Sequence, residues 1–213
     1  MQILLQEIIP TYFEKEQITG SEIWDKNISF NKGEHVHIVA PSGSGKTSLI
    51  HFIYGLRKDY EGTISYQNEN IKNFSLEKYS TFRQRHLSIV FQDLRLFAEQ
   101  SVKNNIELKR QLNPYHPPQK MEEMARRLGI LNKLSRLAKT CSYGEQQRIA
   151  IIRSLMQPFD FLLMDEPFSN LDESNRAKAF ELIKEECTLR NASMIFADLK
   201  ELDFLKREKI LKL

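Results

Sequence analysis

The chain has 213 residues, enough for one sizeable domain or for a core with an inserted subdomain, and for a substantial hydrophobic core. Hydrophobic residues make up 41% of the sequence and charged residues 28%, with 8 glycines and 7 prolines, a composition that excludes disordered, collagen-like and repeat-dominated proteins. The net charge of +3 is too small to predict a nucleic-acid or membrane partner from electrostatic attraction alone.

The chain carries no sequence mark of secretion or membrane insertion. Its two cysteines, Cys141 and Cys187, have no second cysteine or histidine nearby at zinc-site spacing, which favours a reducing cytoplasm. The first residues, MQILLQEIIP, lack the basic region and the long apolar stretch of a signal peptide. The apolar runs are too short to cross a bilayer, so we expect neither an exported nor a membrane-spanning chain.

The hydrophobic pattern predicts strands that alternate with helices. Apolar and β-branched runs predict strands at 35–39, 63–66, 87–91, 161–164 and 193–196, with a last short strand near Ile210. The run at 161–164 is apolar throughout and suits a parallel strand covered on both faces. Helical spacing predicts helices at 47–54, 121–128, 143–156 and 173–189. The sequence therefore predicts an α/β layered core with a helical block between Ser101 and Gln157, and a proline-rich loop at 113–118.

A glycine-rich segment follows the strand at 35–39 and precedes the helix at 47–54. Glycines allow successive backbone N–H groups to turn toward phosphate oxygens, and a helix N-terminus adds positive partial charge. Lys46 would reach the β- and γ-phosphates, and Thr47 would give its hydroxyl to Mg²⁺. Ala40 stands where this motif usually has its first glycine. The predicted phosphate-binding loop consists of Ala40, Pro41, Ser42, Gly43, Ser44, Gly45, Lys46, Thr47 and Ser48.

Two carboxylates, Asp165 and Glu166, end the apolar strand at 161–164. They are expected at the carboxyl edge of the sheet, where α/β proteins bind ligands. Asp165 would hold the Mg²⁺ shell, and Glu166 would act as the general base on a water in line with the γ-phosphate. The alternative is that both acids only cap the next helix, and the phosphate-binding loop argues against it.

Three further motifs complete the pattern. The segment 141–148 is CSYGEQQR, the segment 90–93 is VFQD and the segment 169–172 is SNLD. Together they resemble the signature, the Q-loop and the D-loop of the ATP-binding-cassette family of ATPases, in the family's order and over nearly the whole chain. The resemblance implies a P-loop NTPase (RecA-like) core at about 1–92 and 158–213, an N-terminal antiparallel β-subdomain and an α-helical subdomain inserted at about 93–157.

The signature segment has a physical meaning of its own. Ser142 followed three residues later by Glu145 is a capping box, which predicts a helix start. The resemblance implies a dimer that sandwiches two ATP molecules, in which Ser142 and Gly144, with Gln146 nearby, contact the γ-phosphate held by the other chain. Tyr143 replaces a usual glycine. An ordinary capped helix is the alternative.

The Q-loop residue Gln92 would, by the same resemblance, reach Mg²⁺ or the attacking water. The segment after it would form the groove that receives a coupling helix from a membrane permease. Leu94, Leu96 and Phe97 could instead be core or hinge residues. The resemblance thus implies a catalytic set of Glu166, Gln92 and Lys46, and metal ligands from Thr47, Gln92 and Asp165.

An aromatic side chain near the N-terminus would stack on adenine in this family. Tyr12 and Phe13 are the two candidates, and we favour Tyr12. Either ring could equally belong to the core of a strand.

The family's switch histidine is missing. None of the five histidines lies after the signature, and the resemblance to the family's motif order places Asp198 at the switch position. An ionised carboxylate there would repel the γ-phosphate unless it is protonated, turned away or bridged by a cation. Two hypotheses follow: Glu166 with Mg²⁺ suffices for hydrolysis, which we favour, or the chain is an ATP-gated interaction module with little turnover.

The segment 71–97 is similar to the region around the Q-loop in the lipoprotein-release, macrolide-export and cell-division branch of the family. The resemblance therefore implies an ATP-binding and ATP-hydrolysing subunit of an ABC transporter, of export or mechanotransmission type, with ATP and Mg²⁺ as cofactors. Its implied partners are a second, identical ATPase subunit and a permease that holds it on the cytoplasmic face of the membrane. No nucleic acid is expected. A DNA-repair cassette would need a long coiled-coil insertion and a translation protein usually carries two cassettes, and the sequence shows neither feature. A P-loop kinase or GTPase would leave the signature and the D-loop unexplained.

Overall fold

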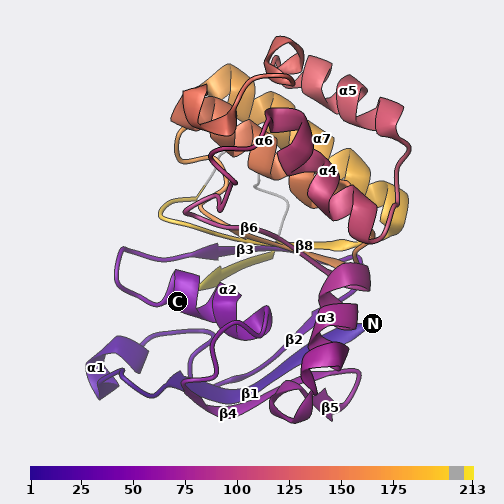
Figure 1. The fold of residues 1–213 in the computed structure, drawn as a ribbon. Coiled ribbons are helices and arrows are strands. Elements are labelled where there is room, and N and C mark those ends of the chain that lie inside the picture. The colour runs from indigo at the N-terminus through magenta and orange to yellow at the C-terminus, as the bar shows by residue number, and fades with distance from the viewer. Residues whose placement is uncertain (202–208) are drawn as a thin grey trace.

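The computed structural model describes residues 1–201 and 209–213, and its strands form two sheets (Figure 1). The antiparallel sheet has the order β2-β1-β4-β5, made of β2 (Asn27–Asn31), β1 (Gln2–Pro10), β4 (Tyr60–Tyr66) and β5 (Glu69–Asn70). The second sheet is parallel in the order β6-β7-β8-β3-β9, made of β6 (Leu87–Val90), β7 (Phe161–Asp165), β8 (Ser193–Asp198), β3 (His35–Val39) and β9 (Lys209–Lys212). The expected mixture of an antiparallel and a parallel sheet in an α/β fold is confirmed.

The helices occupy two layers. The α2 helix (Lys46–Ile53) lies between the two sheets, and α4, α6 and α7 cover the other face of the parallel sheet (Figure 1). These three helices are α4 (Val102–Leu112), α6 (Tyr143–Leu155) and α7 (Glu173–Arg190). The other helices are α1 (Lys15–Ile18), α3 (Leu76–Arg85) and α5 (Pro118–Arg127), with 3-10 turns at Ile71–Asn73, Leu131–Lys133 and Ala138–Thr140.

The parallel sheet separates two hydrophobic cores. One core packs Trp24, Phe52 and the inner face of the antiparallel sheet around α2. The other packs α4 to α7 against the sheet, with Ile149, Ile152 and Met156 fully buried at the predicted helical spacing. Because both faces of β7 are covered, all of its residues are buried, as its uninterrupted apolar sequence indicates.

The predicted elements agree closely with the structure, with one correction. The proline-rich segment was expected to be a loop through Pro118, yet Pro118 is the first residue of α5. A proline is favourable there because its fixed φ suits a helix and the first turn needs no N–H donor. The division into a core at about 1–92 and 158–213 and a helical subdomain at about 93–157 stays a prediction. In the described ranges 1–201 and 209–213, no helix is long and apolar enough to span a membrane.

Candidate nucleotide-binding site

The glycine-rich loop joins the carboxyl end of β3 to the start of α2, in the middle of the parallel sheet. Gly45, which precedes α2, has a φ of 92°, a conformation that other residues adopt only with strain. A Cβ atom at Gly45 would also lie 2.8 Å from the ring of Phe13 and 2.9 Å from that of Trp24. Glycine is therefore required at this position both by the backbone and by the two aromatic rings packed over it.

Lys46 is the buried cation of the loop, with only 6% of its surface exposed. Its Nζ donates hydrogen bonds to the carbonyl oxygens of Ala40 at 2.9 Å and Pro41 at 2.8 Å. The same Nζ lies 3.9 Å from Oε1 of Glu166. The ammonium group thus stands between the loop and the carboxylate at the end of β7, where a terminal phosphate would have to lie.

Asp165 ends β7 beneath the loop and is 1% exposed. Within the described residues, neither of its carboxylate oxygens has a hydrogen-bond partner. Burial raises the pKa of Asp165, and the nearby Thr47 hydroxyl opposes that rise. The Thr47 hydroxyl also lies 3.3 Å from Oε1 of Gln92, to which it donates. A buried carboxylate without a partner, a hydroxyl and an amide oxygen are hard oxygen donors, so these residues fit Mg²⁺.

Glu166 follows Asp165 with a φ of 46°, a left-handed conformation that is uncommon for a residue with a side chain. Its backbone holds this conformation through four hydrogen bonds, one of them a 3.3 Å bond from the N–H of Ser169 to its carbonyl oxygen. In the others, its N–H donates to the oxygen of Ala197 at 2.9 Å, and its carbonyl oxygen accepts from the side chains of Gln147 and Ser169, each at 3.1 Å. The left-handed turn points the carboxylate toward Lys46 instead of along the strand.

Asp198 ends β8, which lies between β7 and β3 in the sheet. Its carbonyl oxygen accepts a 3.1 Å hydrogen bond from the N–H of Ala40, the first residue of the glycine-rich loop. Burial raises the pKa of the Asp198 carboxyl, the N–H of Leu199 opposes this, and the negative charge of Glu166 raises it further. A second carboxyl group therefore stands beside the loop and within electrostatic reach of Glu166.

An open pocket of about 240 Å³ lies over the loop. Tyr12 borders it with 47% of its surface exposed, its hydroxyl 2.5 Å from Oγ of Ser48 and its ring 5.0 Å from the guanidinium carbon of Arg57. Phe13 is more enclosed, because its ring packs edge-on to Trp24 at 5.7 Å. The pocket is lined by Tyr12, Phe13, Ser42, Gly43, Gly45, Lys46, Thr47, Ser48, Gln92 and Glu166.

The signature segment lies outside this pocket. The capping box is formed as predicted, since Ser142 accepts from the N–H of Glu145 at 3.3 Å and Glu145 accepts from the N–H of Ser142 at 2.8 Å. Gly144 is packed so closely that a Cβ atom there would lie 2.8 Å from the oxygen of Asn170. Gln146 donates to the oxygens of Ala138 at 3.2 Å and Cys141 at 3.0 Å. Within one chain, Ser142, Gly144 and Gln146 are therefore not brought to the phosphate loop.

Sequence reasoning did not identify two contacts of the site. Tyr143 Oη donates a hydrogen bond to the backbone oxygen of Gln92, and the Arg57 guanidinium lies over the Tyr12 ring. Both contacts join residues that are far apart in sequence, so no local pattern predicts them. Leu94, Leu96 and Phe97 are the three apolar residues that follow the Q-loop. Leu94 is buried, Leu96 packs against the core, and of the three only Phe97 is exposed.

Three comparisons with known proteins bear on this site. A family model described as "ABC transporter" matches residues 24–169. The "molybdate/tungstate import ATP-binding protein WtpC" of Pyrococcus horikoshii is 40% identical over 164 residues, which cover 75% of this chain and 46% of that protein. The chain thus spans about half the length of the WtpC relatives that it matches.

A relative of similar length also matches. The "lipoprotein-releasing system ATP-binding protein LolD" of Idiomarina loihiensis is 30% identical over 193 residues, covering 88% of this chain and 85% of that protein. Among solved structures, the "dimeric structure of MJ0796, a bacterial ABC transporter cassette" has a TM-score of 0.83 at 23% identity, covering 99% of this chain and 94% of that one. That structural likeness establishes the same fold.

Proposed function

Because the chain belongs to the ABC transporter family of ATP-binding cassettes, we propose that it binds ATP with Mg²⁺ and hydrolyses it as the ATPase subunit of a transporter. One arrangement carries the proposal: Lys46 and Glu166 lie 3.9 Å apart, and the buried carboxylate of the adjoining Asp165 has no hydrogen-bond partner among the described residues. The general requirements of phosphoryl transfer are a cation for the terminal phosphate, metal ligands and a base for water. These three residues have the chemistry for those tasks.

Binding would begin with the loop. The backbone N–H groups of residues 42–48 and the start of α2 would hold the phosphate oxygens, and Lys46 would turn from the Ala40 and Pro41 carbonyls toward the γ-phosphate. Thr47, Gln92 and Asp165 would hold Mg²⁺. When bound, that ion neutralises charge on the phosphate oxygens.

Glu166 would then accept the proton of the attacking water while the water oxygen forms its bond to the γ-phosphorus. The bond from that phosphorus to the leaving oxygen of ADP breaks, and the Lys46 ammonium group stays beside the negative charge of the transferred phosphoryl group. The left-handed backbone of Glu166 supports this role, because it holds the carboxylate on the Lys46 side of the strand end. Tyr12 would stack on the adenine, being the more exposed of the two aromatic rings at the pocket.

A second candidate function rests on Asp198. Its carboxyl replaces a hydrogen-bond donor with an acceptor beside the loop, so the chain would instead be an ATP-gated interaction module that binds nucleotide with little turnover. We favour hydrolysis because the metal ligands and the base are all present. The sandwich dimer belongs to both functions, since Ser142, Gly144 and Gln146 lie away from the phosphate loop of their own chain and would act on a second chain.

The proposed partner is a membrane permease that contacts the groove beside the Q-loop. It would hold the chain at the cytoplasmic face of the membrane. The names of the relatives differ in direction, since WtpC is an import protein and LolD belongs to a lipoprotein-releasing system. We infer the export or mechanotransmission type from the sequence around the Q-loop.

The test is Mg²⁺-dependent ATP turnover measured against protein concentration for the wild type, Glu166→Gln and Asp198→His. Turnover that rises more than linearly with concentration and is lost in Glu166→Gln would support a dimeric ATPase. A silent wild type that gains activity in Asp198→His would favour the ATP-gated module. Turnover unchanged in Glu166→Gln would contradict the assigned base.

A further inference from the structure

Arg57 follows α2 and contacts three different kinds of group beside the candidate site. Its Nη1 donates a hydrogen bond to Oγ of Ser48 at 3.2 Å, and its Nε donates to Oδ1 of Asp59 at 3.0 Å. Its guanidinium carbon lies 5.0 Å from the centre of the Tyr12 ring. A planar guanidinium can serve a hydroxyl, a carboxylate and an aromatic face at once, which a lysine ammonium group cannot. Arg57 therefore joins the last residue of the phosphate-binding loop to the aromatic ring at the edge of the pocket.

The Tyr12 ring is held on three sides. Its hydroxyl lies 2.5 Å from Oγ of Ser48, its edge packs against Phe13 with 5.3 Å between the ring centres, and Arg57 lies over one face. An exposed side chain without such contacts changes its rotamer within nanoseconds. Here 47% of the surface of Tyr12 remains exposed although these groups hold the ring. The fold thus presents an ordered aromatic surface at the pocket.

Arg57 itself stays outside the pocket. Tyr12 and Ser48 line the pocket over the loop, and Arg57 does not. The guanidinium also has its donors engaged, because Asp59 accepts from Nε and Nη2 and Ser48 accepts from Nη1. A nucleotide in the pocket would therefore meet the exposed part of the Tyr12 ring and not the guanidinium. Any effect of Arg57 on the nucleotide must act through Tyr12 or Ser48.

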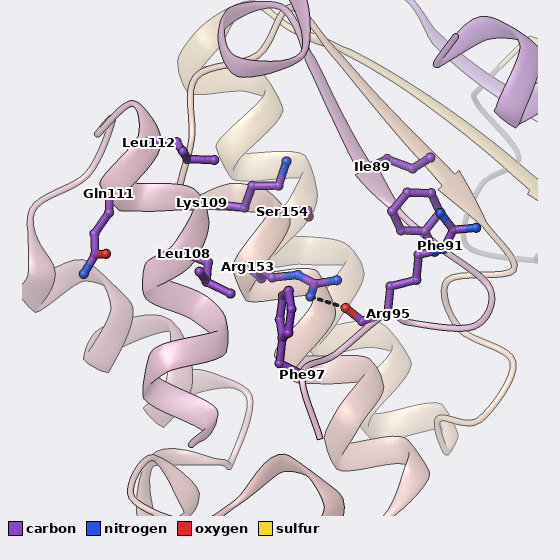
Figure 2. A pocket seen from close by; sticks show the side chains of 10 residues that line it. All are labelled: Ile89, Phe91, Arg95, Phe97, Leu108, Lys109, Gln111, Leu112, Arg153 and Ser154. Atoms are coloured by element: carbon purple, nitrogen blue, oxygen red, sulfur yellow. Dashed lines mark hydrogen bonds between the residues drawn. The ribbon is translucent and has the colours of Figure 1, made fainter. Parts of the chain in front are cut away.

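A second arginine has a similar arrangement without the link to the loop. Arg95 lies beside the Phe91 ring (Figure 2), with its guanidinium carbon 4.1 Å from the ring centre. It also donates to a carboxylate two residues away, that of Asp93, as Arg57 does. In the described part of the chain, however, the Arg95 side chain donates to no residue of the phosphate-binding loop. The bond to Ser48 is thus what connects the Arg57 pair to the nucleotide site.

We propose that Arg57 is a positioning residue for the nucleobase. It holds the Tyr12 ring from one face and fixes the hydroxyl at Ser48, so that the exposed face of the ring is presented to a stacked adenine. A ring that is ordered before binding loses less conformational entropy when the base stacks on it, and this strengthens binding. The inference rests on the proposed function and adds a residue that governs the base and leaves the phosphate contacts unchanged.

The experiment compares the affinities of MgATP and of magnesium tripolyphosphate, which has the phosphates and no base, by isothermal titration calorimetry. In Arg57→Gln, ATP affinity should fall about three- to tenfold, the size expected for a lost cation–π contact and a less ordered ring. Tripolyphosphate affinity should be unchanged, which also shows that the variant is folded. Lys58→Gln is the matched control, because it makes the same charge change at the next residue, whose ammonium group lies 5.2 Å from the centre of the Tyr79 ring. Both affinities should keep their wild-type values there.

A double-mutant cycle tests whether Arg57 acts through Tyr12. In a Tyr12→Ala background, Arg57→Gln should change ATP affinity by less than about twofold, since the ring that Arg57 positions is absent. Arg57→Lys keeps a cation near the ring and should lose less affinity than Arg57→Gln. In turnover assays of Arg57→Gln, the KM for ATP should rise and kcat should be unchanged.

Each alternative gives a different result. Equal losses of ATP and tripolyphosphate affinity in Arg57→Gln would assign Arg57 to the phosphates or to the stability of the loop, and would overturn the proposal. An undiminished effect in the Tyr12→Ala background would also overturn it. ATP binding that depends on Arg57 in a chain without turnover would count against the proposed hydrolysis and leave the positioning role intact. Turnover with an unchanged KM in Arg57→Gln would overturn the positioning role alone.

Discussion

The hydroxyl of Tyr143 donates a 3.0 Å hydrogen bond to the backbone oxygen of Gln92, which lies 51 residues earlier in the chain. Gln92 accepts from Thr47 through its side chain, so one residue connects the start of the signature helix to the phosphate loop. By the resemblance of the signature segment, Tyr143 replaces a usual glycine. The tyrosine therefore adds a link between two regions that the proposed sandwich dimer would have to align.

We expect Tyr143→Phe to weaken the alignment of the signature helix without removing a group from the pocket. Loss of one hydrogen bond of about 1 kcal/mol corresponds to roughly a fivefold higher protein concentration at half-maximal turnover. The melting temperature should fall only slightly. Tyr115→Phe is the matched control, because the Tyr115 hydroxyl has no hydrogen bond in the described residues. Equal behaviour of the two variants would show that the bond has no such effect.

Asp198→Asn should raise stability and nucleotide affinity at neutral pH. The pKa of Asp198 is raised in the folded chain, so the folded state binds the proton more tightly than the unfolded state, and stability falls as pH rises above the ordinary value of 3.8. Asparagine removes that loss. ATP affinity should rise about three- to tenfold, as expected for removing one like-charge contact of about 1 kcal/mol. Calorimetric titration at pH 7.5 measures the affinity, and thermal unfolding at pH 4 and 7.5 should show a gain only at the higher pH.

Glu186→Gln should cost about 3 to 5 kcal/mol of stability, because Arg190 would be left buried without its charged partner. Glu186 is buried on α7, hydrogen-bonds to Arg190 and lies 2.6 Å from Nε2 of His116. Glu185→Gln is the control on the same helix. Glu185 pairs with Arg127 at the surface, so Glu185→Gln should lower the free energy of unfolding by less than about 1 kcal/mol. Urea unfolding of both variants makes the comparison, and similar midpoints would contradict it.

The pH dependence of Glu186 has a definite sign. Burial alone would raise its pKa, but the hydrogen bonds from His116 and Arg190 outweigh burial and lower it. The ionised Glu186 therefore contributes to the free energy of unfolding at pH values above the ordinary glutamate pKa of 4.5, and this contribution is lost as the pH falls below 4.5. Glu186→Gln should remove this part of the acid sensitivity.

Lys109 should be unusually reactive toward acylating reagents. With a pKa of about 8, about a tenth of its amines are neutral at pH 7, against fewer than about one in a thousand for an ordinary lysine. Trace labelling with acetic anhydride, read by peptide mass spectrometry, should show faster labelling at Lys109 than at the exposed Lys103.

Local sequence patterns predicted the parts of the site that are continuous in the chain. The strand at 35–39 matches β3, the apolar run before Asp165 matches β7, and Ser142 with Glu145 forms the predicted cap. In each case the deciding interactions lie within a few residues: a run of apolar side chains, a glycine turn or a helix start.

The remainder depends on contacts between distant segments. The first strands, β1 and β2, were not predicted individually, because their pairing is with each other and with β4 across many residues. Phe13 is enclosed by Trp24 and Tyr12 is left exposed, which only the folded chain decides. The alternating pattern after Gln92 likewise does not reveal that Leu94 is buried and Phe97 is exposed.

The carbonyl oxygens of Ala40 and Pro41, which accept hydrogen bonds from Lys46, compete with any bound anion for the ammonium group. An incoming anion must break two charge-assisted bonds before it gains the ammonium group. A single small anion offers too few contacts to compensate for them, whereas a triphosphate meets the whole run of backbone N–H groups at once. Breaking the two bonds costs the same for any anion that takes the ammonium group, so a preference for nucleotide over orthophosphate comes from the contacts of the backbone N–H groups and not from Lys46.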